Sequence, residues 1–314
     1  MKYILKKLLV MLITILLVSF FVFLAFELIP GDPALNKLGT NATETALSAL
    51  REQMGLNKPF FVRYFSWVIN LFRGDFGKSY SYNMSVSKML LDKLPITITL
   101  TLFSFVLIVL ISIPLGIYIT EHDGSIISRI IDVINQIFMA VPSFFAGIII
   151  TYVFGLTLKL FVPGGYVSYS TNFLRFFSYL IFPSIAIALP KIAMTVKMLK
   201  SSILSEAKLD YVRTAYSRGN TTRGVLYKHV LKNAFIPVIT FLGMTLSDMV
   251  AGSLIVEQVF SIPGFGRLLV TSISNRDYPV VEAIIVIIAF IVIFINLLVD
   301  IAYRFIDPRT RNNE

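Results

Sequence analysis

Residues 283–298 read AIIVIIAFIVIFINLL, and no charged side chain occurs between Glu282 and Asp300. A helix needs roughly 20 apolar residues to cross the hydrocarbon core of a bilayer, so we expect a membrane span over about 280–303. Five further apolar runs are long enough to do the same, over about 8–29, 96–120, 131–156, 176–196 and 235–256. The sequence therefore predicts an all-α membrane protein with six transmembrane helices.

The overall composition agrees with a chain that spends most of its length in lipid. Of its 314 residues, 56% are hydrophobic and only 15% are charged, against about 25% charged in soluble domains. The absence of Cys excludes disulfides and thiolate chemistry, and two histidines, His122 and His229, argue against a His-built metal site. We expect no catalytic residue and no metal ligand in this chain, and we attribute the net charge of +10 to basic cytoplasmic loops rather than nucleic-acid binding.

The first apolar run has an alternative interpretation as a cleaved signal peptide. Signal peptides have a shorter apolar core of about 7–15 residues and end at a small-residue cleavage site. Here the run is longer and leads into Pro30-Gly31-Asp32-Pro33. We favour an uncleaved first helix.

The distribution of Lys and Arg predicts the orientation of the chain. With the N-terminus inside, the inner segments 1–7, 121–130, 197–235 and 304–314 hold fifteen basic residues, whereas the short outer loops 157–177 and 258–279 hold four. Basic residues collect in cytoplasmic loops. Both termini are therefore predicted to be cytoplasmic.

This orientation divides the chain into four regions. Residues 1–29 form the N-terminal tail and first helix, and residues 30–95 a small extracellular domain that turn signals and composition predict to be helical. Residues 96–306 form a core of five transmembrane helices that includes the inner loop 197–235. Residues 307–314 form a cytoplasmic tail.

The inner loop 197–235 carries eight basic residues against Glu206 and Asp210. Its pattern predicts a helix over about 201–217, a stop at Gly219-Asn220, and a second helix over about 223–233 that Thr221 or Thr222 caps. Charge alone favours a loop that meets anionic lipid headgroups. The alternative is a docking surface for another protein.

Particular residues in this loop favour docking. The spacing resembles that of the EAA loop of binding-protein-dependent ABC importers, and the matching positions are Arg213-Thr214-Ala215, Gly219 and His229-Val230-Leu231-Lys232. The first Glu, the Ile and the Pro of that pattern are replaced. Further blocks follow in order through the chain: Pro30-Gly31-Asp32-Pro33, Gly55-Leu56-Asn57-Lys58-Pro59, Arg73-Gly74-Asp75-Phe76-Gly77, Val141-Pro142-Ser143-Phe144, Glu257-Gln258-Val259-Phe260-Ser261-Ile262-Pro263-Gly264-Phe265-Gly266, Arg276-Asp277-Tyr278-Pro279 and Asp307-Pro308-Arg309. Together they resemble the B-type permease subunit of the dipeptide, oligopeptide and nickel importer family.

The resemblance implies the type I ABC importer permease fold, in a bacterial inner membrane, and a set of partners. These are a second, C-type permease subunit, two cytoplasmic ATPase subunits, an extracellular substrate-binding protein that the outer domain helps to receive, and the lipid bilayer; nucleic acid is not among them. No cofactor is expected in this chain, because ATP and Mg²⁺ bind to the partner ATPases.

The resemblance also implies how the loop works. A coupling helix centred on about 214–223 would transmit closure of the ATPases to the membrane helices. The residues assigned to this role are Arg213, Thr214, Ala215, Gly219, Asn220 and Arg223. Substitution of Gly219 is expected to weaken ATPase association or coupling.

Polar residues inside the spans are costly in lipid and point to function. Asp248, beside Ser247, is expected to face the translocation path and contact a cationic part of the cargo; a carboxyl that fastens neighbouring helices is an equally good interpretation. Lys191 is expected to snorkel or to cap carbonyls freed by Pro190. Asn296 is expected to make a hydrogen bond between helices.

The sequence leaves alternatives open for the cargo and for the class of protein. The resemblance favours short peptides, with nickel or another metal complex as the alternative cargo. A self-sufficient secondary transporter would show internal repeats, and none is evident. An intramembrane enzyme would need a catalytic constellation, and the chain has no HExxH motif and no Cys.

Overall fold

The computed structural model describes residues 2–28, 31–39 and 42–306. Within these ranges the regular structure is helical, with one isolated antiparallel bridge between Lys78 and Ser85. The expectation of an all-α fold is confirmed. The block Asp307-Pro308-Arg309 and the rest of the predicted tail 307–314 lie outside the described residues.

Five single helices are long and apolar enough to cross a membrane. They are α1 (Lys2–Leu28), α5 (Val86–Glu121), α8 (Phe173–Glu206), α11 (Leu231–Val259), which α10 and a π-helical turn extend back to Thr222, and α13 (Tyr278–Ile306). Each coincides with one of the predicted runs, the first of which, 8–29, ends one residue beyond the described part of α1. Most helices extend well beyond their runs, because the polar residues that flank an apolar run also adopt helical structure.

The predicted third span is not a continuous helix. It consists of α6 (Ile126–Ala140) and α7 (Ser143–Ile150), which a π-helix over Thr151–Thr157 extends, and the two parts meet at 103°. The cause is Pro142, which disfavours helical geometry in the residue before it; Val141 accordingly has φ −87° and ψ 118°. The expected six spans are obtained when this bent pair counts as one.

The chain divides into two compact units. Unit 1 combines residues 1–97 with 263–294, and unit 2 combines residues 98–262 with 295–314. In unit 1, α1 packs on α4 (Phe60–Phe72) through aromatic rings, with Phe20 and Phe23 each 5.4–5.6 Å from Tyr64 between centroids. Unit 1 also contains the small helices α2 (Pro33–Leu38), α3 (Glu44–Gln53) and α12 (Phe265–Ser274).

One buried carboxylate connects distant segments of unit 1. Asp277 has no exposed surface. It accepts hydrogen bonds from Ser79 Oγ at 2.5 Å, from Tyr80 N at 2.8 Å and from Ser81 N at 3.2 Å. The turn that precedes α13 is thereby fixed to the loop 76–83 that precedes α5.

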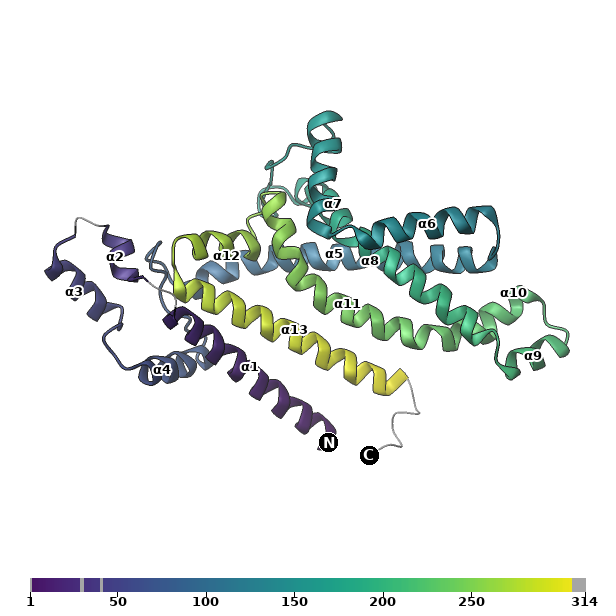
Figure 1. Ribbon diagram of the computed structural model, residues 1–314, viewed down its shortest axis with the longest axis horizontal. Coiled ribbons are helices and arrows are strands. Elements are labelled where there is room, and N and C mark those ends of the chain that lie inside the picture. The colour runs from purple at the N-terminus through teal and green to yellow at the C-terminus, as the bar shows by residue number, and fades with distance from the viewer. Residues whose placement is uncertain (1, 29–30, 40–41, 307–314) are drawn as a thin grey trace. The chain divides into compact units, whose positions relative to one another are not determined.

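In unit 2, α8 is the central helix and packs against α6, α7 and α11. The short helices α9 (Asp210–Ser217) and α10 (Thr222–Val225) connect the end of α8 with α11. Figure 1 shows α9 and α10 at the same end of unit 2 as the turn between α5 and α6. The two loops predicted to be cytoplasmic therefore share one end.

Candidate functional site: the α9 loop and the polar pair between spans

The α9 loop, residues 207–225, presents a short helix at the end of unit 2. The chain leaves α8 after Glu206, forms α9, turns at Arg218–Thr221 and enters α10. Gly219 has φ +81°, a left-handed conformation that only glycine adopts without strain. Thr221 Oγ1 accepts from Gly224 N at 3.2 Å and caps α10.

The predicted second helix over 223–233 is wrong as a separate element. Residues 222–225 form α10, residues 226–230 a π-helical turn, and the helix continues directly into α11. The end of the α9 loop is therefore a rigid extension of the fifth span. A π turn arises where an extra residue is inserted into a helix, which residue periodicity does not reveal.

The sequence-predicted coupling residues occupy different positions on the loop. Arg213 and Thr214 lie on the exposed face of α9, and Arg223 is exposed on α10. Ala215 is buried, at 5% exposure, and its carbonyl accepts from Asn220 Nδ2 at 3.0 Å. The buried face thus positions the helix, while the exposed face is available to a partner.

A polar triangle that the sequence did not reveal attaches α9 to the two long helices. The Tyr211 hydroxyl donates to Glu206 Oε1 at 2.7 Å, and Asn233 Nδ2 donates to Glu206 Oε1 at 3.0 Å. Asn233 Nδ2 also lies 3.2 Å from Tyr211 Oη. Burial raises the pKa of the Tyr211 phenol and the bond to Glu206 raises it further, so the phenol keeps the proton that it donates.

Removal of one hydroxyl group tests this attachment. Tyr211→Phe deletes the bond to Glu206, which is worth about 1 kcal/mol, and we expect amide exchange in α9 to become roughly fivefold faster. Hydrogen exchange of the assembled protein would measure it. Tyr216→Phe is the matched control, because Tyr216 lies on the same helix and is 46% exposed. Equal exchange in both variants would contradict the role of the triangle.

At the same end of unit 2, Lys200 connects α8 to the turn between α5 and α6. Its Nζ lies 2.8 Å from Asp123 Oδ1 and 2.8 Å from Asp132 Oδ2. The hydrogen bond from Lys200 outweighs the effect of burial and lowers the pKa of Asp123 below its usual value. This cluster fixes the framework from which α9 projects.

Two polar pairs lie within the spans of unit 2. Ser247 is buried and donates to Asn296 Oδ1 at 2.8 Å, which confirms the expected hydrogen bond between helices. Lys191 Nζ on α8 lies 3.2 Å from Asp248 Oδ2 on α11, which agrees with the interpretation of Asp248 as a carboxyl that fastens neighbouring helices. The expected snorkelling of Lys191 stays a prediction. The Asp248 side chain is 71% exposed.

An ion pair on the surface of apolar helices is costly in lipid. The exposed pair Lys191–Asp248 therefore requires water or a partner protein on its open side. The pair also explains how the fifth span tolerates the carboxylate of Asp248, because each of the two charges has a counter-ion.

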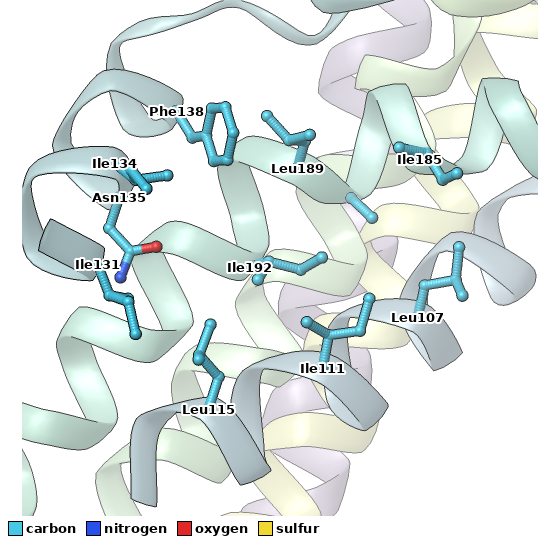
Figure 2. A pocket seen from close by; sticks show the side chains of 11 residues that line it. Leu107, Ile111, Leu115, Ile131, Ile134, Asn135, Phe138, Ile185, Leu189 and Ile192 are labelled. Carbon is cyan, nitrogen blue, oxygen red and sulfur yellow. The ribbon is translucent and has the colours of Figure 1, made fainter. Parts of the chain in front are cut away.

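A separate apolar cavity of about 400 Å³ lies between α5, α6 and α8 (Figure 2). It is lined by Leu107, Ile111, Leu115, Ile131, Ile134, Asn135, Phe138, Ile185, Ala188, Leu189 and Ile192. Asn135 supplies the one polar side chain of this lining, and its Nδ2 has no hydrogen-bond partner among the residues that the structure describes. Charged cargo would lose its hydration there without compensation, so this cavity does not provide a path for it.

The fold and these sites define a multi-pass helical membrane protein with a short helix presented at one end of its long spans. Residues 112–312 match the family "Binding-protein-dependent transport system inner membrane component", and residues 1–101 match the N-terminal model of such membrane components. The chain belongs to this family of inner-membrane transport proteins.

Similar proteins extend over the whole chain. A probable peptide ABC transporter permease of Sinorhizobium fredii, y4tP, is 35% identical over 98% of this chain and 99% of its own length. The oligopeptide transport system permease AppB of Bacillus subtilis is 35% identical over 98% of both chains. A putative peptide transport system permease of Brucella abortus is 35% identical over 94% of both.

These findings confirm the resemblance to ABC importer permeases. The chain is a transport subunit rather than an enzyme, and it acts together with other components of an ABC importer. It is a multi-pass protein of the inner membrane.

Proposed function

We propose that this chain forms half of the translocation pathway of an importer for short peptides. The observation that carries the proposal is its full-length similarity to permeases that are named for peptide or oligopeptide transport. Nickel, the alternative cargo, has less support, because these relatives are named for peptides.

The proposal assigns three kinds of protein partner. A second permease subunit completes the pathway, two cytoplasmic ATPase subunits bind ATP and Mg²⁺, and an extracellular receptor delivers the peptide to the outer region 30–95. Both termini and the α9 loop face the cytoplasm. The exposed side chains of Arg213, Thr214 and Arg223 contact the ATPase subunits, while Gly219 and Asn220 shape the turn and Ala215 holds α9 in place.

Uptake by the reconstituted transporter tests the function. The chain, its second permease subunit and the ATPases are incorporated into proteoliposomes with the receptor outside and ATP inside. Accumulation of labelled tri-alanine that depends on ATP would support peptide import. Accumulation of Ni²⁺ without any peptide uptake would contradict it.

Within the pathway, the pair Lys191–Asp248 provides a charged contact for cargo. Its exposed side carries both signs of charge in a region where lipid would exclude them. A zwitterionic peptide offers an ammonium to Asp248 and a carboxylate to Lys191. Ser247, bonded to Asn296, positions the helix behind the pair.

Neutralisation of one partner of this pair tests its role. Asp248→Asn removes the carboxylate that we assign to the peptide ammonium, and we expect peptide uptake to fall about tenfold or more, since a hydrogen bond to a charged group contributes about 1.5–3 kcal/mol. Expression and membrane insertion should stay normal. Ser253→Ala, which removes a hydrogen bond to Val250 within the same helix but no charge, is the control. Unchanged uptake by Asp248→Asn would reject the assignment.

A further inference from the structure

Unit 1 contains a polar cavity of about 910 Å³ that the coupling and pathway residues do not use. Its walls come from the end of α1, the small helices α2 to α4, the loop 76–83 and the first turns of α13. Small-molecule sites commonly measure about 300–1,000 Å³. The cavity therefore has the size of a ligand site.

The carboxyl group of Glu282 lies in the wall of this cavity. Glu282 is 6% exposed, and it makes no hydrogen bond or ion pair with another residue in the part of the chain that the structure describes. Arg63 acts on it electrostatically, but Arg63 forms its ion pair with Glu27. A buried carboxylate without a donor is costly, so Glu282 is an acceptor that the chain itself leaves unused.

The same walls contain unused hydrogen-bond donors. Buried donor atoms that have no hydrogen-bond partner among the described residues are Arg63 Nε, Trp67 Nε1 and Tyr278 Oη. Burial raises the pKa of Tyr80, so this phenol in the wall also stays protonated. The residues that carry these groups line the same space as Glu282.

A metal ion fits this lining poorly. The described residues contain no group of three or more His, Cys, Asp or Glu side chains that could hold a metal, and the donors in the wall would oppose a cation held by one carboxylate. An amine next to a carbonyl group fits better, because the amine donates to Glu282 and the carbonyl accepts from the wall. Aromatic faces such as those of Trp67 and Tyr80 also stabilise ammonium groups.

We propose that the cavity of unit 1 binds the free amino terminus of a peptide, with the Glu282 carboxylate as counter-ion to its ammonium group. The inference rests on the peptide cargo proposed above and adds a recognition site outside the pair Lys191–Asp248. It predicts selection for peptides whose amino terminus is unmodified.

Equilibrium binding to the whole transporter without its extracellular receptor, in nanodiscs, tests this site. The probes are labelled tri-alanine and N-acetyl-tri-alanine, in which the acetyl group removes the charge of the amino terminus. Hydrogen bonds to charged groups contribute about 1.5–3 kcal/mol, so tri-alanine should bind at least about tenfold more tightly. Glu282→Gln should remove the preference that remains in the Asp248→Asn background, in which the other proposed contact for the ammonium group is absent.

Glu52→Gln is the matched control, because Glu52 lines the same cavity but is exposed. It should keep the preference for the free amine. Equal binding of both peptides to the unmodified protein, or an unchanged preference in Glu282→Gln in the Asp248→Asn background, would overturn the inference. The inference would also be overturned if tri-alanine did not bind and Glu282→Gln weakened the binding of the extracellular receptor. That result would identify a lysine of the receptor as the occupant of the cavity.

Uptake in the proteoliposome assay separates the two proposals. If the unmodified transporter accumulates tri-alanine but its binding does not distinguish the acetylated peptide, the site is wrong and the peptide function stands. If no peptide is accumulated, the peptide function itself fails.

Discussion

Replacing Asp277 with alanine is expected to detach the loop 79–81 from the start of α13. The carboxylate is fully buried and accepts from Ser79, Tyr80 and Ser81. Its removal leaves a buried hydroxyl and two backbone donors unpaired, and the expected cost is roughly 3–5 kcal/mol.

Limited proteolysis would measure that effect. When opening is faster than cleavage, the cleavage rate follows the population of the open loop, so trypsin should cut at Lys78 about 100-fold faster or more in Asp277→Ala. Asp75→Ala is the control, because Asp75 accepts from Gly77 N at 2.9 Å within an exposed turn of the same loop. Equal cleavage of the two variants would show that Asp277 does not hold the loop.

The second large effect is expected from Gly219→Val in the α9 loop. Gly219 has φ +81° and open space where a side chain would begin, so the penalty comes from the backbone, at roughly 1–2 kcal/mol for a residue with a side chain. The turn is expected to relax by changing the direction of α9. We expect ATP-driven uptake to fall at least about tenfold, because a small misplacement of a coupling element has large kinetic consequences.

Gly124→Val provides a matched control for this substitution. Gly124 has φ +83° and open space, and it lies in the turn between α5 and α6 at the same end of unit 2. Both variants carry the same backbone strain, but Gly219→Val places it in the α9 loop itself, whereas Gly124→Val places it in the turn between α5 and α6. Normal substrate-stimulated ATPase activity in Gly219→Val, or equal losses in both variants, would refute the coupling role.

Apolar content allowed most of the fold to be predicted from the sequence. Runs of about 20 apolar residues leave few alternatives to a membrane helix, and five of them form continuous helices. Hydropathy alone could not show the bend at Pro142, because it measures composition and not backbone geometry. The restriction that a proline places on the residue before it was the available signal.

The site could be predicted only where its signal is local. The left-handed turn at Gly219 follows from the residue itself. The partner of Asp248 could not be found in this way, because Lys191 is 57 residues away. Asp277 resembled an ordinary turn residue, although its hydrogen-bond partner Ser79 lies 198 positions earlier.

Glu282 could not be singled out for a related reason. In the sequence it directly precedes the apolar run 283–298, where a charged residue is ordinary. Only the packing of α1, α4 and the loop 76–83 around the first turns of α13 shows that it is buried in a cavity. Burial of this kind is a tertiary property.

Cross-linking from α9 in the complete transporter tests most directly whether ATPase movement enters through this helix. The chain contains no cysteine, so Ser217→Cys introduces a single reactive thiol at the exposed end of α9. A thiol-specific photo-cross-linker should join it to an ATPase subunit in membranes that carry out ATP-driven uptake. Adducts with the extracellular receptor, or active membranes in which no ATPase adduct forms, would contradict the coupling role of α9.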